Sequence, residues 1–187
     1  MKQSKNHTPL FLTDYKNSFL ECIDMQIKAR NHLSKKDKKE LFSQLADLFG
    51  EEVEDSVQRD LIIEEVRTDE GTYIVSNSRI WVFEFENKKI PTIHYLRNHA
   101  YSLPKIVVDI GAIKFITNGA DVMAPGIVYF DESIVEGSIV IIHEEKANSI
   151  LGVGKSLVSA KEFSKTKKGK VIKNLHHLRD SIWGFQF

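Results

Sequence analysis

Three glycines and one proline fall within the sixteen residues from Gly111 to Gly126, GAIKFITNGADVMAPG. Glycine inside a helix or strand costs about 0.5–1 kcal/mol relative to alanine, so this density favours turns or places where the backbone closely approaches another group. Residues 112–117 are long enough for one or two helical turns, and Asn118-Gly119 tolerates the positive φ that ends a helix. The segment predicts a short helix, a glycine turn and then an apolar strand.

The residues of this segment leave two interpretations open. It is either a tight connection whose large apolar side chains belong to the core, or a loop that presents its backbone to a ligand. The apolar side chains in question are Ile113, Phe115, Ile116, Val122 and Met123.

Acidic and basic residues balance, 26 of each, so the formal net charge is zero. Global charge gives no support to nucleic-acid binding, and a positive surface would have to be local. Cys22 is the single cysteine, which excludes an intrachain disulfide and favours a reducing compartment. The start of the chain has no secretory leader pattern, and about 18 apolar residues never run together, so we expect a cytoplasmic protein with no membrane partner.

Residues 1–103 predict an N-terminal α+β domain, an α/β sandwich-like unit with an antiparallel sheet. Ser34 followed by Asp37 is typical of a capped helix start, and apolar residues at helical spacing continue to Gly50. Beyond it come β-rich segments separated by polar turns and then one short helix. The expected strands are 61–63, 73–75 and 80–85, and the expected helix is 92–98.

Residues 104–187 predict a small, mostly β barrel with one or two short helices. The boundary is expected at Leu103-Pro104, because proline disfavours helix in the residue before it. The expected strands are 106–108, 122–130, 138–143, 149–154 and 181–187.

Two motifs that suggest chemistry are both incomplete. The run 152–156, GVGKS, ends like a P-loop, but Ser149 stands where that motif needs its first glycine. His143-Glu144 begins like a zinc-protease helix, but Ala147 stands where the second histidine would be. A pair of carboxylates in an apolar setting is also missing from the pattern. The sequence predicts no catalytic residue, no metal ligand and no cofactor.

Basic residues are frequent in the second domain, and Lys114 lies just before the Asn118-Gly119 turn. If the barrel brings several cations beside the glycine segment, they would neutralise phosphates while the backbone contacts sugar or base. An ordinary lysine-rich surface is the alternative. The other cations are Lys155, Lys161, Lys165, Lys167, Lys168, Lys170, Lys173 and Arg179.

The runs 109–115 and 119–127 resemble the signature of the PUA domain. The similarity continues downstream through 137–140, 150–156, 169–171 and 174–183. The last run, with the pattern His-x-Leu-x-Asp-x-x-Trp from His176 to Trp183, is similar to the malignant T-cell-amplified sequence family and its archaeal relatives. Those proteins join a small α+β domain to a PUA pseudo-barrel, so the resemblance implies the same fold here.

The resemblance also implies a non-catalytic RNA-binding protein of the translation apparatus, which binds tRNA or small-subunit ribosomal RNA. Eukaryotic members work with a density-regulated partner, so the expected partners are RNA, the ribosome and a protein of that type. PUA domains face RNA with the short helix, the following loop and the next strand. Here these give Lys114, Asn118, Gly119, Ala120, Asp121, Val122, Met123, Pro125 and Gly126, to which the charge argument adds Lys155, Lys170 and Arg179.

Two other functions stay open at this point. The same domain is appended to pseudouridine synthases and tRNA-guanine transglycosylases, so the chain could be an RNA-binding accessory subunit of an RNA-modifying enzyme. A self-contained enzyme with its site between the domains is the third hypothesis, and it requires an acid–base pair at that interface.

Overall fold

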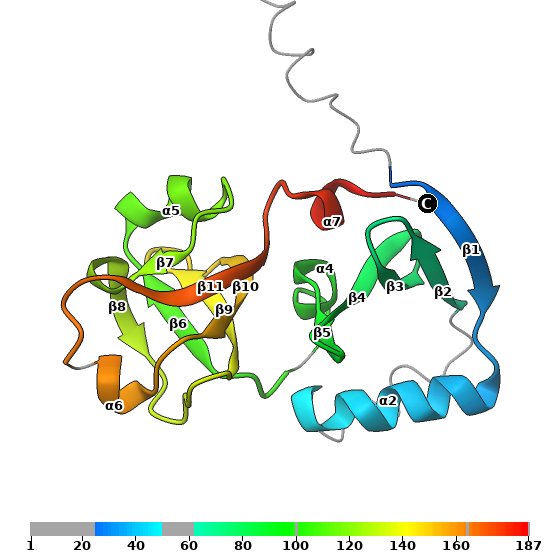
Figure 1. Cartoon of the computed structure of the whole chain (residues 1–187), viewed down its shortest axis with the longest axis horizontal. Coiled ribbons are helices and arrows are strands. Elements are labelled where there is room, and N and C mark those ends of the chain that lie inside the picture. The colour runs from blue at the N-terminus through cyan, green and yellow to red at the C-terminus, as the bar shows by residue number, and fades with distance from the viewer. Residues whose placement is uncertain (1–24, 50–61, 100, 164, 187) are drawn as a thin grey trace, which may run out of the picture.

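The computed structural model describes residues 25–49, 62–99, 101–163 and 165–186, and Figure 1 shows them as two lobes, each built around one sheet. We call residues 25–99 the N-terminal lobe and residues 101–177 the C-terminal lobe. None of the helices in these ranges is both long and apolar enough to cross a membrane. Cys22 and Gly50 lie outside the described residues.

The N-terminal lobe contains a five-stranded antiparallel sheet in the order β1-β2-β3-β4-β5. Two of its connections are two-residue turns in which both residues have positive φ, as in type I′ hairpins. Asn77-Ser78 joins β3 to β4, and Glu86-Asn87 joins β4 to β5. The strands are β1 (Ile27–His32), β2 (Ile63–Thr68), β3 (Thr72–Ser76), β4 (Arg79–Phe85) and β5 (Lys88–Pro91).

Helices α2 (Lys35–Phe49) and α4 (Ile93–Leu96) begin at polar caps. At the start of α2, the Asp37 amide donates to Ser34 Oγ over 3.2 Å, and the Asp37 carboxylate accepts from the Ser34 amide over 3.3 Å, as the capping pattern predicts. Thr92 caps α4 by accepting from the Tyr95 amide, and its hydroxyl donates to Ile80 O over 2.6 Å. Thr92 thereby ties α4 to β4.

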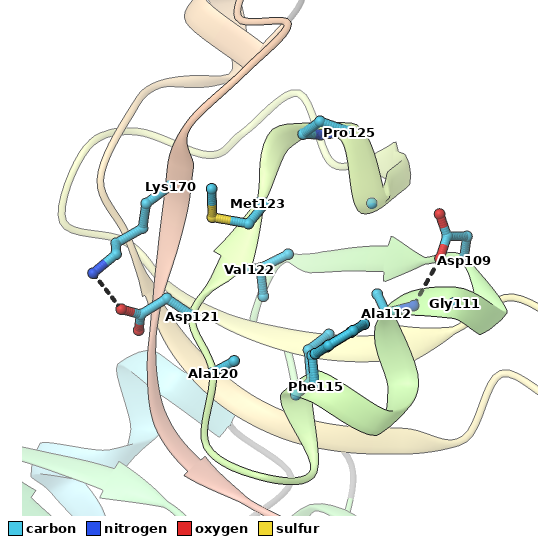
Figure 2. A pocket seen from close by; sticks show the side chains of 12 residues that line it. Asp109, Gly111, Ala112, Phe115, Ala120, Asp121, Val122, Met123, Pro125 and Lys170 are labelled. Carbon is cyan, nitrogen blue, oxygen red and sulfur yellow. Dashed lines mark hydrogen bonds and ion pairs between the residues drawn. The ribbon is translucent and has the colours of Figure 1, made fainter.

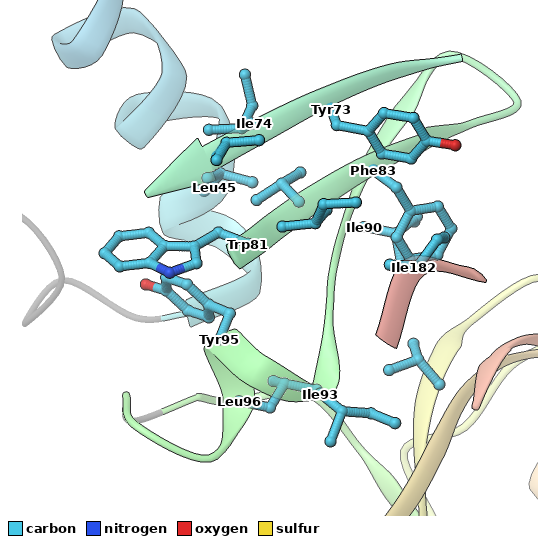
Figure 3. Close-up of a cluster of buried hydrophobic side chains, with 14 of the residues drawn as sticks. Leu45, Tyr73, Ile74, Trp81, Phe83, Ile90, Ile93, Tyr95, Leu96 and Ile182 are labelled. Atoms are coloured by element: carbon cyan, nitrogen blue, oxygen red, sulfur yellow. The ribbon is translucent and has the colours of Figure 1, made fainter. Parts of the chain in front are cut away.

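The core of the N-terminal lobe lies between the sheet and its helices (Figure 3). Leu45 of α2, Trp81 of β4 and Tyr95 of α4 are all buried there. The Trp81 and Tyr95 rings meet edge to face, with centroids 5.5 Å apart.

The C-terminal lobe contains a six-stranded sheet in the order β7-β11-β10-β9-β6-β8, curled into a pseudo-barrel. One pair, β6 and β9, is parallel, and the other neighbours are antiparallel. The strands are β6 (Lys105–Val108), β7 (Val122–Met123), β8 (Ile127–Phe130), β9 (Ile139–Glu144), β10 (Ile150–Ser156) and β11 (Lys170–His177). The short helices are α5 (Ile110–Ile116), the 3₁₀ helix η1 (Ala124–Gly126) and α6 (Ala160–Phe163). The predicted α+β fold with a mostly β pseudo-barrel is confirmed.

The glycine-rich run 152–156 forms the second part of strand β10, so it is not the loop that a P-loop requires. A Cβ at Gly154 would overlap the Ile172 side chain and come within 2.8 Å of Lys173 O. The glycine lets β10 and β11 approach closely, as expected for an architectural position.

Two predicted strands need correction, and other strands were not predicted. The strand expected over 122–130 is interrupted by η1, because Pro125 has no N–H for a strand ladder. The strand expected over 181–187 is wrong, since Ser181–Gly184 forms helix α7, started by Asp180 Oδ1 accepting from the Trp183 amide over 2.8 Å. Strands β1, β5 and β11 were not predicted.

The C-terminal end of the chain returns to the N-terminal lobe through α7. Ile182 is buried in the N-terminal core, and the Trp183 ring stacks on His94 of α4 at 4.1 Å between centroids. His94 Nε2 donates to Trp183 O over 3.0 Å, and the Arg97 guanidinium lies 4.9 Å from the Trp183 centroid. We call residues 176–183 the C-terminal clamp.

The clamp is anchored at its other end by His176, which is completely buried. Its Nδ1 lies 2.7 Å from Asp180 Oδ2, and its ring meets Phe83 of β4 edge to face at 5.9 Å. Burial alone would raise the pKa of Asp180, but the His176 contact and two backbone amides outweigh it and lower the pKa. The clamp follows the predicted domain boundary at residues 103 and 104 in sequence, but it packs on the N-terminal lobe. The boundary therefore stays a proposal.

We predict that Trp183→Ala lowers the free energy of unfolding by about 1–3 kcal/mol, because it removes the stacked ring from α4. Urea unfolding followed by circular dichroism measures the loss. Trp183→Phe, which keeps a ring against His94, should lose less than half of that amount. Equal stability of all three proteins would show that the clamp contributes nothing.

Candidate functional site

A groove of about 680 Å³ lies between α5, β7 and η1 (Figure 2). Most of its lining side chains are apolar, and charged groups stand at its edges. The lining residues are Asp109, Gly111, Ala112, Phe115, Ile116, Ala120, Asp121, Val122, Met123, Pro125, Gly126 and Lys170. We call it the α5–β7 groove.

Asp109 fixes the first turn of α5 and one end of the groove. Its Oδ1 accepts from the Ala112 amide over 2.8 Å, and its own amide donates to Gly126 O over 2.9 Å. The helix therefore begins at Ile110, earlier than predicted, and Gly111 lies in its first turn. The second bond joins the start of α5 to the end of η1.

Gly119 ends α5 in a left-handed conformation, with φ of 88°. Its amide donates to Ile116 O and the Ala120 amide to Phe115 O, both over 3.0 Å, the two bonds of a Schellman motif. A Cβ at Gly119 would lie 3.1 Å from His177 Nε2. The glycine turn predicted at this position is confirmed, and the site favours glycine for two independent reasons.

Side chains of β11 hold the loop that follows this turn. The side-chain Nδ2 of Asn174 donates to Ile116 O and to Ala120 O, both over 3.0 Å. The backbone amide of Asn174 donates to Asp121 Oδ1 over 2.7 Å. Asp121 Oδ2 lies 2.5 Å from Lys170 Nζ. One asparagine and one aspartate thus connect the loop to β11.

The environment of Asp121 favours its charged form. Burial alone would raise the pKa of Asp121, but the bond from Lys170, the Asn174 amide and the charges of Lys170 and Lys173 outweigh it and lower the pKa. The ionised carboxylate offsets the charge of Lys170 at the rim. The groove is therefore an apolar surface with a paired charge at its edge.

Two large apolar side chains of the groove remain exposed, Phe115 at 65% and Met123 at 50%. Ile116 and Val122, from the same segment, are buried in the C-terminal core. The segment therefore contributes side chains to both the core and the surface. Exposed apolar groups that line a concave surface are typical of binding sites.

The predicted site residues fall into three groups. The groove brings together Ala120, Asp121, Val122, Met123, Pro125, Gly126 and Lys170. Lys114, Asn118 and Gly119 belong to α5 and its terminal turn without lining the groove. Lys155 and Arg179 lie elsewhere: Lys155 Nζ is 2.5 Å from Glu86 Oε2 of the N-terminal lobe, and Arg179 is in the turn before α7. Sequence reasoning missed Asn174, whose role depends on strand pairing, and placed Phe115 only in a possible core.

We predict a pH-dependent cost for Asp121→Asn. A lowered pKa means that the carboxylate stabilises the fold above its ordinary pKa of 3.8, and that this stability is lost as the pH falls through the folded-state pKa. The variant should lose about 0.5–2 kcal/mol of unfolding free energy at pH 7 and less at pH 3. Urea unfolding of both proteins across this range measures it. A cost that is the same at both pH values would contradict the ionised Asp121–Lys170 pair.

Comparison with known proteins places this groove in a recognised domain. The PUA domain model matches residues 104–178. The chain is 41% identical over 162 residues to an uncharacterized protein of Methanocaldococcus jannaschii, covering 87% of this chain and 99% of that protein. A crystal structure of a hypothetical protein from Pyrococcus horikoshii is 36% identical with a TM-score of 0.68, and the match covers 83% of this chain and 98% of that one.

Two eukaryotic relatives carry descriptive names. Human malignant T-cell-amplified sequence 2 is 35% identical over 124 residues, which covers 63% of this chain and 68% of that protein. Translation machinery-associated protein 20 of Eremothecium gossypii is 32% identical over 119 residues, covering 60% of this chain and 65% of that protein. The chain therefore belongs to the family of PUA-domain proteins that includes malignant T-cell-amplified sequence 2 and these archaeal relatives.

Proposed function

We propose that this protein binds RNA of the translation apparatus through the α5–β7 groove and performs no chemistry on it. The observation that carries the proposal is the exposure of Phe115 and Met123 in a groove beside the Gly119 turn. Unpaired bases stack on aromatic faces, and polar backbone and lysine groups contact sugar and phosphate. The groove lies in the segment where the PUA resemblance implies an RNA-facing surface.

The RNA we propose is tRNA or small-subunit ribosomal RNA, bound in the cytoplasm. The name of the Eremothecium gossypii relative supports a link to the translation machinery. The zero net charge and the Asp121–Lys170 pair limit non-specific attraction to RNA. We therefore infer that the ribosome, and a protein of the density-regulated type, share the binding.

A non-catalytic role agrees with the surroundings of the His–Asp pair between the lobes. His176 is fully buried, and Asp180 accepts from the His177 and Trp183 amides. An acid–base pair needs access to a substrate proton. The position of the His176–Asp180 pair in the clamp supports a structural role for these two residues. This weakens the hypothesis of an enzyme site between the lobes.

We predict that Phe115→Ala weakens binding of bulk tRNA about tenfold, because it removes a stacking surface. Lys114→Gln should weaken it less and reduce the salt dependence by about one phosphate contact. Fluorescence anisotropy with labelled tRNA measures both effects at KCl concentrations from about 50 to 200 mM. Affinity that depends on phosphate contacts falls steeply over this range. Gly119 is a poorer probe, since its replacement would strain the turn.

Lys36→Gln on α2 is the charge-matched control and should bind like the wild type. Thermal melting checks that Phe115→Ala stays folded, as expected for an exposed side chain. Wild-type affinity in both groove variants would exclude the groove as the RNA site. Recovery of an RNA-modifying enzyme instead of ribosomes in pull-downs would favour the accessory-subunit hypothesis.

A further inference from the structure

A cluster of lysines continues from the α5–β7 groove to the junction of the two lobes. We propose that the bound RNA backbone follows Lys173 and Lys155 across this junction, and that Glu86 is an internal anion which RNA phosphate displaces from Lys155. This inference rests on the proposed function and extends it to a second contact surface on the N-terminal lobe.

The pairing of β10 with β11 places Lys155 directly opposite Lys173. Side chains at facing positions share one face of the sheet, and like charges there are unfavourable. Two groups of the N-terminal lobe offset this repulsion. The Phe85 ring lies 4.8 Å from Lys173 Nζ and 6.0 Å from Lys155 Nζ, and Glu86 Oε2 lies 2.5 Å from Lys155 Nζ.

Glu86 is the carboxylate that these cations act on. Glu86 is half exposed, in the turn between β4 and β5, and its pKa is lowered by the bond from Lys155 and then by the charges of Lys155, Lys173 and Lys88. Three lysines thus act on one carboxylate. An incoming phosphate can take the place of that carboxylate, and lysine is a common phosphate partner.

Lys173 links this cluster to the groove. Lys170, three residues earlier on β11, is paired with Asp121 at the groove rim, and the charge of Lys173 also acts on Asp121. Lys170 and Lys173 of β11 therefore lie between the groove and the β4–β5 turn, where Lys155 of β10 faces Lys173. A row of cations fits a sugar–phosphate backbone, whose charges repeat along the strand.

A purely structural role for the cluster makes a different prediction about Glu86. If Lys155–Glu86 only joins the lobes, Glu86→Gln changes stability alone. If Glu86 competes with phosphate, the same change frees Lys155 and tightens RNA binding. The direction of the Glu86→Gln effect separates the two roles.

The experiment measures the affinity of the full chain for labelled bulk tRNA as a function of KCl concentration. We expect Lys173→Gln and Lys155→Gln each to weaken binding about three- to tenfold and to reduce the salt slope by about 0.7–0.9. Glu86→Gln should tighten binding about two- to fivefold. The matched controls are Lys161→Gln on α6, at the end of the C-terminal lobe away from the junction (Figure 1), and Glu132→Gln, beside Tyr129 near β8. Both should bind like the wild type.

The extended path would be overturned if Lys173→Gln and Lys155→Gln kept the wild-type affinity and salt slope and Glu86→Gln did not bind tRNA more tightly. If Phe115→Ala still weakens binding in that case, the proposed function stands and the RNA is confined to the groove. If the wild-type chain itself shows no binding to tRNA at low salt, the proposed function fails and this inference fails with it.

Discussion

The candidate site depends on the hydrogen bonds by which β11 fixes the loop after α5. Asn174 binds two carbonyl oxygens of that loop and the Asp121 carboxylate, across 53 to 58 residues of sequence. A loop that exposes backbone and apolar side chains has little core of its own to stabilise it. The groove therefore depends on the folding of the C-terminal lobe.

The two lobes share one buried core, which makes their relative position part of the site. Ile141 of β9 and Val153 of β10 belong to the same apolar cluster as Trp81 and Tyr95 of the N-terminal lobe. The C-terminal clamp adds a stacked pair, Trp183 on His94, to this contact. Because the lobes are joined in this way, a contact surface can cross from one to the other without reorganisation.

The parts of the fold that were predictable from sequence are those with local causes. The capped start of α2, the Gly119 turn and the incomplete P-loop all follow from residue types at fixed spacing. The short strands of residues 104–187 predicted a small barrel, and the resemblance carried by residues 109–127 identified it as a PUA pseudo-barrel. The elements that failed depend on distant partners: β1 is exposed along nearly its whole length, so it lacks apolar alternation, and β11 pairs with β10 through an irregular register.

The site residues divide in the same way. Phe115 has the spacing of a core residue, and sequence periodicity cannot separate an apolar side chain that lines a binding groove from one that is buried. Lys155 and Arg179 were grouped with the groove by charge, but strand pairing and the clamp place them elsewhere. The run from His176 to Trp183 resembles a family motif. In the structure it packs the C-terminal clamp against the N-terminal lobe.

The most direct test of the groove as the binding surface is amide hydrogen exchange of the full chain with and without bulk tRNA. We expect tRNA to slow exchange in residues 115–123, which form the end of α5, the Gly119 turn and β7. Amides of α2 should exchange at unchanged rates. Protection confined to α2 or β1, with residues 115–123 unaffected, would contradict the account.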